Sequence, residues 1–148
     1  RIFMVYGPGQ VDHTKVVPYS ILAGLRGEAP RLTSGTRPVD WIFVDDVVAG
    51  LLAAGEVAGI EGETFDLGSG ELVTVRQIVE KICHALAAPP PEIGAIADRP
   101  LEFVRRANVA KSFSRLGWRP AIGREEGLHR TIVGLRGELA SGAYTPRS

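Results

Sequence analysis

The sequence has 148 residues, of which 45% are hydrophobic and 23% are charged, a composition typical of one globular domain. Lys plus Arg and Asp plus Glu each number 17, and the resulting formal net charge of zero argues against nucleic acid or an anionic membrane surface as a partner. The single cysteine cannot form an internal disulfide and no apolar stretch could span a bilayer, so we expect a cytoplasmic protein.

The chain opens with an apolar run that predicts a strand. Residues 2–6 are continuously apolar, as in strands buried on both faces, and the Gly-Pro-Gly turn at residues 7–9 ends the run. Apolar residues at helical spacing then predict a helix over residues 16–26, with Gly27 as its stop.

A second strand and a second helix follow. Residues 40–44 are predicted to form the strand, and Asp45 or Asp46 is expected to cap the helix, which ends near Gly55. The apolar residues that this helix is expected to bury are Val47, Val48, Leu51 and Leu52.

A third strand is predicted over residues 63–67. Thr74, with Gln77 three residues later, forms a capping-box pattern that predicts a helix start. The proline triplet at 89–91 ends this helix, and a short strand is expected around residues 93–96. One apolar face is predicted from the spacing of Val75, Ile78, Val79, Ile82, Cys83 and Leu86.

The last part of the chain is predicted to be helical. Asn108 can cap a helix that ends at Leu116, and a final helix is expected over residues 123–139, weakened by its three internal glycines. We expect one domain over residues 1–140 and a disordered tail over residues 141–148.

Alternating strands and helices predict an α/β fold. Three convincing strands are fewer than an open α/β sheet usually has, so we expect an incomplete sheet whose first strand needs cover. The sequence contains no glycine-rich dinucleotide turn, no metal-ligand spacing and no nucleophile motif. We therefore expect no catalytic residue and no metal site in this chain.

Four separated stretches share a family pattern. They are RIFMVYGPGQ (1–10), DWIFVDDV (40–47), FDLGSG (65–70) and LGWRP (116–120). In this order and spacing they resemble the C-terminal half of the extended short-chain dehydrogenase/reductases, specifically the NAD-dependent nucleotide-sugar epimerases and dehydratases. The resemblance runs from residue 1 to about residue 132.

The resemblance implies the substrate-binding portion of an extended Rossmann-type enzyme. In that family the N-terminal half carries the NAD turn and a catalytic Tyr-x-x-x-Lys, and NAD takes a hydride from a nucleoside diphosphate sugar. None of Tyr6, Tyr19 and Tyr144 has a lysine four residues later. The chain is therefore expected to be a fragment that is inactive alone. Its expected partner is the N-terminal half of the same protein, which would bind most of the NAD and through which the family commonly forms homodimers.

The resemblance also implies that this half binds the nucleotide, whose pyrophosphate suits guanidinium groups. Arg99 matches a family arginine that contacts the phosphates. The usual second arginine position is occupied by Val39, but in an extended chain Arg37 would point the same way. The further family positions are Lys15, Val16, Pro18, Leu32, Ser34 and Trp41 for substrate, with Ile2 and Phe3 beside the cofactor.

Other interpretations remain open at this point. The family often has asparagine where Met4 stands, and a thioether cannot donate that hydrogen bond. Met4 and Val39 therefore favour, as an alternative, an extended-family NAD(P)-dependent reductase on a non-nucleotide substrate. A non-catalytic binding module is a third alternative. Ordinary packing explains Leu32, Ser34 and Trp41 equally well.

Overall fold

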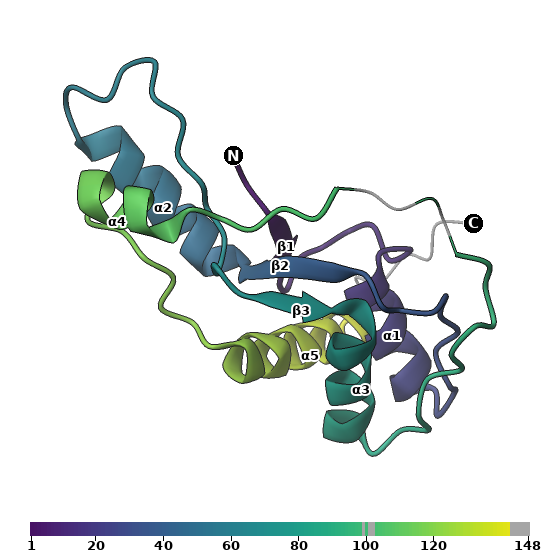
Figure 1. Ribbon diagram of the computed structural model, residues 1–148. Helices are drawn as coiled ribbons and strands as arrows, with labels where there is room; N and C mark the ends of the chain where they lie inside the picture. Colours follow the sequence, from purple (N-terminus) through teal and green to yellow (C-terminus); the bar gives the residue numbers. More distant parts are fainter. Residues whose placement is uncertain (99, 101–102, 143–148) are drawn as a thin grey trace.

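A three-stranded sheet organises the chain (Figure 1). The computed structural model describes residues 1–98, 100 and 103–142. In it, β1 (Met4–Tyr6) pairs in parallel with β2 (Pro38–Phe43), and β2 pairs antiparallel with β3 (Leu72–Thr74). β2 is therefore central, and the predicted α/β fold with a small sheet is confirmed.

Helices cover this sheet in two groups. The described part of the chain contains α1 (Val16–Leu25), α2 (Val44–Glu56), α3 (Val75–Leu86), α4 (Val109–Leu116) and α5 (Arg124–Ala140). Figure 1 shows α1, α3 and α5 gathered together, whereas α2 and α4 lie side by side at the other end of the molecule.

β2 is buried on both faces because its side chains alternate between two hydrophobic clusters. Val39, Trp41 and Phe43 belong to the larger cluster, which also contains residues of α1, α3 and α5. Ile42 points the other way and packs with Leu67 and residues of α2 and α4. Packing on both faces therefore holds β2 in place, together with the residues at its N-terminal end.

Two predicted strands are wrong. Over residues 63–67, only Leu67 pairs with the start of the chain, in a single bridge to Ile2. The Leu67 amide donates to the Arg1 oxygen at 2.8 Å, and the Phe3 amide donates to the Leu67 oxygen at 3.0 Å. On the opposite edge of the segment, the Asp66 oxygen accepts a hydrogen bond from the Ser112 hydroxyl of α4 at 2.7 Å, so a side chain rather than a further strand meets that edge.

The predicted strand over residues 93–96 is replaced by a turn. Gly94 adopts a left-handed φ of 78°, which an extended strand cannot contain. The third strand is instead β3, three residues long, directly before α3. The capping box of α3 is confirmed: the Thr74 hydroxyl accepts from the Gln77 amide at 3.2 Å, and the Gln77 side chain accepts from the Thr74 amide at 3.0 Å.

The start of α2 also differs from the prediction. The helix begins at Val44, directly after β2, and no side chain caps it. The carboxylate of Asp46 instead accepts hydrogen bonds from the amides of Ala121 and Ile122, at 2.8 and 3.0 Å. Asp46 therefore ties α2 to the segment before α5, and the prediction that it or Asp45 caps the helix is wrong.

The burial predicted for α2 is only partly correct. Val47 is buried against the second cluster, as expected. The three other apolar residues expected to be buried are exposed, at 50% for Val48, 54% for Leu51 and 63% for Leu52. Their spacing of three and four residues places them together on one face of the helix, which nothing in the described chain covers.

Candidate ligand-binding site

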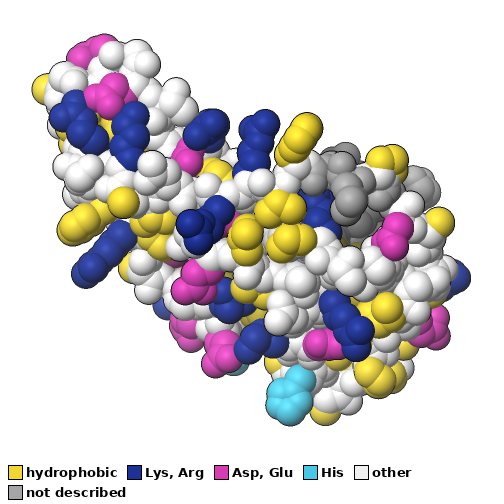
Figure 2. All heavy atoms as spheres, viewed as in Figure 1, with side chains coloured by type: hydrophobic (Ala, Val, Ile, Leu, Met, Phe, Trp, Pro, Cys, Tyr) yellow, Lys and Arg dark blue, Asp and Glu magenta, His cyan; other side chains and the backbone are white. Residues whose placement is uncertain are grey.

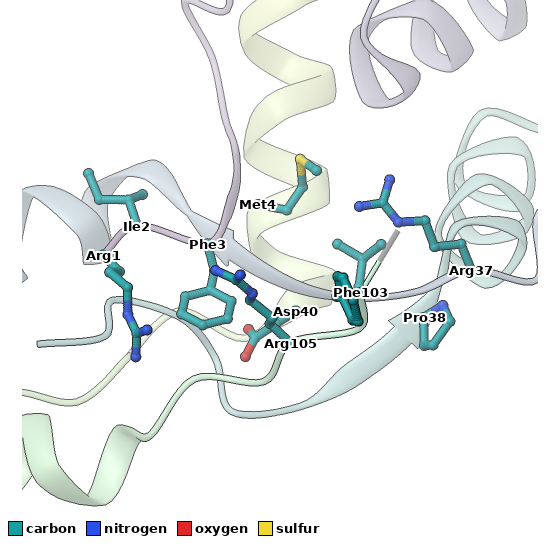
Figure 3. A pocket seen from close by; sticks show the side chains of 10 residues that line it. Arg1, Ile2, Phe3, Met4, Arg37, Pro38, Asp40, Phe103 and Arg105 are labelled. Carbon is teal, nitrogen blue, oxygen red and sulfur yellow. The ribbon is translucent and has the colours of Figure 1, made fainter. Parts of the chain in front are cut away.

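A hollow of about 360 Å³ lies where the start of the chain, the start of β2 and the segment around residue 104 meet (Figure 3). This volume suits a small-molecule ligand. The residues that line it are Arg1, Ile2, Phe3, Met4, Arg37, Pro38, Val39, Asp40, Phe103 and Arg105.

Positive charge dominates the hollow. Three of its lining residues are arginines, from three separate parts of the chain: Arg1, Arg37 and Arg105. Arg105 is exposed and makes no hydrogen bond or ion pair within the described residues. Such guanidinium groups favour an anionic ligand, phosphate above all.

The acidic residue in the lining, Asp40, has its carboxylate already occupied. It is 1% exposed and accepts from the Ser69 amide and hydroxyl at 2.6 and 2.8 Å, from the Gly70 amide at 3.0 Å and from the Ala107 amide at 2.9 Å. Asp40 thereby joins β2, the turn after Leu67 and the segment that carries Arg105. It is a structural anchor that positions the wall of the hollow.

A second buried carboxylate orients Arg1. Asp66 accepts from Arg1 Nε and from the Asn108 amide, both at 2.9 Å. Burial alone would raise the pKa of Asp66, but these donors outweigh it and hold the pKa below its ordinary value. The ionised carboxylate therefore fixes the Arg1 side chain at the edge of the hollow.

One side of the hollow is apolar. Ile2, Met4 and Phe103 line it and are all exposed, Phe103 to 92%. Figure 2 shows hydrophobic side chains gathered over β1 and β2 on this face, with Lys and Arg side chains around them. The described lining contains no His, Lys, Cys or Tyr that could exchange a proton. The arrangement suits binding of an amphipathic anion rather than acid–base chemistry.

The structure brings together some of the residues predicted from the sequence. Ile2, Phe3 and Arg37 all line the hollow, as does Val39, one pleat from Arg37. Arg99, predicted to contact the phosphates, lies outside the described residues.

Two predicted substrate residues lie in the core instead. Trp41 is buried, its indole Nε1 donates to the Val73 carbonyl at 3.0 Å, and its ring packs edge-on against Tyr6. Leu32 is buried against Val79 of α3. Both side chains are part of the hydrophobic core, because removing a large apolar side chain from water stabilises the folded state.

The remaining predicted residues do not line the hollow. Lys15 is an exposed residue at the start of α1 that pairs with Asp12 at 3.6 Å, while Val16 and Pro18 pack within the body. The amide and hydroxyl of Ser34 both donate to one carboxylate oxygen of Asp98, at 3.0 and 2.9 Å. These donors lower the pKa of Asp98 and join two loops.

Sequence reasoning missed Arg1, Phe103 and Arg105 as lining residues. The sequence could have indicated that Phe103 and Arg105 act together, since side chains two residues apart in an extended chain point to the same side. For Arg1 there was none, because its place depends on a contact with Asp66, 65 residues away.

The described part of the chain contains neither a metal site nor a membrane-spanning helix. No group of three or more His, Cys, Asp and Glu side chains there could hold a metal ion. None of the helices in the described ranges has the length and apolar character needed to traverse a lipid bilayer.

Sequence comparison identifies relatives of this chain. Residues 1–68 match the model of the NAD dependent epimerase/dehydratase family. A UDP-glucose 4-epimerase of Mycolicibacterium smegmatis is 32% identical over 141 residues, covering 89% of this chain and 43% of that protein. A dTDP-glucose 4,6-dehydratase of Neisseria gonorrhoeae is 33% identical over 140 residues, covering 86% of this chain and 40% of that protein. The chain thus spans less than half the length of these curated relatives.

Solved structures share the fold. The UDP-glucose 4-epimerase of Thermotoga maritima, solved with UDP-glucose, superposes with a TM-score of 0.84 at 30% identity, covering 94% of this chain and 45% of that one. MoeE5, solved with UDP-glucuronic acid and NAD, gives 0.82 at 30% identity, covering 93% of this chain and 46% of that one. By the match of residues 1–68, these relatives and the common fold, the chain is similar to members of the NAD-dependent epimerase/dehydratase family over part of their length.

Proposed function

We propose that this chain is the substrate-binding part of an NAD-dependent enzyme that epimerises or dehydrates a nucleoside diphosphate sugar. The observation that carries the proposal is the hollow lined by Arg1, Arg37 and Arg105, whose acidic neighbour Asp40 is fully hydrogen-bonded. A diphosphate is the part of such a substrate that needs fixed positive charge.

Arg37 and Arg105 are the proposed diphosphate ligands. Arg37 is half-buried at the start of β2, and Arg105 comes from a segment anchored by the hydrogen bond between Asp40 and the Ala107 amide. Because the backbone is held at β2 and at Ala107, binding has to order mainly the two arginine side chains and not the chain that carries them. Two relatives named above were solved with UDP-sugars, which supports this ligand class.

NAD is the proposed cofactor, and this chain would contribute little to its binding. The Gly-Pro-Gly turn at residues 7–9 links β1 to α1 but lacks the Gly-x-Gly-x-x-Gly spacing that holds a dinucleotide, so the described part of the chain offers no such cradle for the NAD pyrophosphate. Ile2 and Phe3, which line the hollow, are the proposed cofactor-side contacts. When bound, NAD supplies the hydride chemistry.

The proposed partner is the remaining polypeptide of the same protein. Helix α2 is apolar on two faces: Val47 packs inward, whereas Val48, Leu51 and Leu52 are exposed. A helix that is apolar all round is normally buried. Since the relatives are more than twice as long as the part that this chain matches, their additional half is the proposed cover for this face.

Calorimetric titration of the complete protein with UDP, dTDP and GDP tests the proposal. We expect at least one to bind, and Arg105→Ala to weaken that binding by about tenfold, the loss of one charge-assisted contact. Arg106→Ala is the matched control, because Arg106 is exposed but does not line the hollow. Absence of binding by all three nucleotides would refute the proposal.

One observation favours a second candidate, a reductase of the same family that acts on a non-nucleotide substrate. Met4 lines the hollow with an exposed thioether, which offers no hydrogen-bond donor to a sugar hydroxyl or phosphate. Oxidation or reduction of an apolar carbonyl compound by the complete protein with NAD(P), without nucleotide binding, would select this candidate.

A further inference from the structure

We propose that Ser34 and Asp98 form a link that fixes the spacing between two loops that lead into the hollow, and that both are positioning residues for the bound ligand. Neither residue lines the hollow. The role rests on the proposed function, which supplies the ligand. It differs from the expectation for Ser34 as a substrate contact, because the amide and hydroxyl of Ser34 both donate to Asp98.

The link is made by one carboxylate oxygen. Asp98 Oδ1 accepts from the Ser34 amide at 3.0 Å and from the Ser34 hydroxyl at 2.9 Å. These two donors, the amide foremost, hold the pKa of Asp98 below its ordinary value, so the carboxylate is ionised at neutral pH. Hydrogen bonds to an ionised acceptor are stronger than those between neutral groups.

Backbone hydrogen bonds join the same two loops before the link. Residues 30–34 and residues 92–98 lie side by side: the Leu32 amide donates to the Glu92 oxygen at 2.9 Å, and the Ile96 amide donates to the Leu32 oxygen at 3.0 Å. The Ser34–Asp98 link comes at the end of this pairing. It is therefore the contact from which the two loops would begin to separate.

Each of the two loops continues into the lining of the hollow. Arg37 follows Ser34 by three residues, and Phe103 follows Asp98 by five. Figure 3 shows both side chains at the hollow. Because a chain extends by at most about 3.6 Å per residue, the Cα atom of Arg37 lies within roughly 11 Å of that of Ser34. A contact this close to the hollow limits how far its two sides can move apart.

The segment that carries Arg105 is held at both ends. The link to Ser34 holds it at Asp98, and at its other end the Ala107 amide donates to the buried Asp40 carboxylate at 2.9 Å. A segment held at both ends has less conformational freedom to lose when its side chains bind a ligand. Loss of the link should therefore weaken binding, although no group that touches the ligand is removed.

A charge effect and a positioning effect have opposite signs at Asp98. Removal of a carboxylate near a hollow lined by arginines should, by Coulomb's law alone, strengthen the binding of an anion. Removal of a positioning contact should weaken it. Asp98→Ala removes both the charge and the acceptor, whereas Asp98→Asn removes only the charge, because its amide oxygen can still accept both hydrogen bonds.

Calorimetric titration of the complete protein with UDP, dTDP and GDP tests the effect on binding. For the nucleotide that binds most tightly, we expect Asp98→Ala to weaken binding about fivefold, the loss of one net hydrogen bond, and Asp98→Asn to stay within about twofold of the unmodified protein. Glu28→Ala is the matched control and should change nothing. It removes an exposed carboxylate, paired with Arg26 at 3.0 Å, from the same connection between α1 and β2 that contains Ser34.

Unchanged or tighter binding in Asp98→Ala would overturn the positioning role, and so would an equal loss in Asp98→Asn. Because Asp98 is exposed, its replacement should leave the protein folded, as circular dichroism would verify.

Hydrogen exchange tests the link without a ligand. In Asp98→Ala the Ile96 amide should exchange faster, because the paired loops then open from their end, while the Ala107 amide, held by Asp40, should keep its protection. Mass spectrometry of the corresponding peptides of the complete protein measures both rates. Unchanged exchange at Ile96 would overturn the link. If the unmodified protein bound none of the three nucleotides, the proposed function would fail, whereas the exchange rates would still decide whether the link holds the loops together.

Discussion

Helices α2 and α3 are similar in length and both predicted to be amphipathic, yet they end in different surroundings. The middle of the apolar face of α3 is completely buried, with Ile78, Val79, Ile82 and Cys83 each at most 3% exposed, and Val75 and Leu86 at its ends are partly buried. In α2, the face formed by Val48, Leu51 and Leu52 is at least half exposed. The described chain covers the middle of the apolar face of α3, but it leaves this second apolar face of α2 open.

The difference follows from how many faces of each helix are apolar. α3 has one apolar face, which packs on α1 and on the sheet. α2 has one such face against β2 and a second that the described residues leave at least half exposed. An apolar pattern on a helix therefore indicates that this face is buried in the complete protein, but not whether the same segment of chain buries it.

The largest expected effect is in α3. Ile82→Ala removes a side chain that is 0% exposed in the main core and should destabilise the protein by about 2–5 kcal/mol, through lost transfer energy and a cavity. The measurement is the free energy of unfolding from urea denaturation. Leu52→Ala in this chain is the matched apolar truncation, and we expect it to change stability by less than about 0.5 kcal/mol. Equal effects would abolish the contrast between the helices.

The core that α3 shares with β1 should also respond to pH. Burial raises the pKa of Tyr6 to about 12, against an unfolded value near 10. The unfolded chain therefore loses this proton first, so stability should fall as pH rises from about 10 to about 12, by roughly 2–3 kcal/mol. Tyr6→Phe should remove this part of the dependence, with Tyr19→Phe as the hydroxyl-deletion control. A pH dependence unaltered by Tyr6→Phe would contradict the assignment.

For the exposed apolar face of α2, we expect a substitution to act differently in this chain and in the complete protein. In the complete protein, Leu52→Ala should cost about 1.5–3 kcal/mol if the additional half covers this face, because a leucine is then fully buried. Thermal denaturation of the complete protein and of this chain, each with and without the substitution, measures the difference. A neutral effect in both would show that α2 faces solvent throughout.

The smallest pair of effects lies in α5, whose glycines are not equivalent. A Cβ on Gly127 would lie 2.5 Å from Tyr6 Oη, whereas a Cβ on Gly137 would meet nothing within 4 Å. Gly127→Ala should therefore destabilise by about 1–3 kcal/mol. Gly137→Ala should stabilise by about 0.5–1 kcal/mol through helix propensity. Chemical denaturation checks both, and a stabilising Gly127→Ala would contradict the close packing of α5 on β1.

Several local features were predictable because their causes are local. The capping box of Thr74 and Gln77, the Asn108 cap and the end of that helix at Leu116 depend only on residues within about one helical turn, and all three predictions are confirmed. Arg37 and Val39 both line the hollow, as the extended geometry of this segment predicted. Ile2 and Phe3, which also line it, were chosen from the family resemblance.

The failures have non-local causes. Asp46 was expected to cap α2, but its carboxylate accepts hydrogen bonds from the amides of Ala121 and Ile122. For Trp41 the sequence left a substrate position and ordinary packing open, and its side chain is buried against Tyr6 and bonded to Val73. In each case a partner distant in sequence decided the outcome, and no local pattern encodes that partner.

The sequence alone determined the family resemblance, the N-terminal caps of α3 and α4 and the shared side of residues 37 and 39, since the caps and the shared side rest on short-range geometry. Only the tertiary structure decided that Arg1, Arg37, Phe103 and Arg105 share one hollow and that α2 keeps an uncovered apolar face. The physical reason is that buried carboxylates such as Asp40 bring together amides far apart in the chain, because leaving any of these groups unpaired away from water is costly.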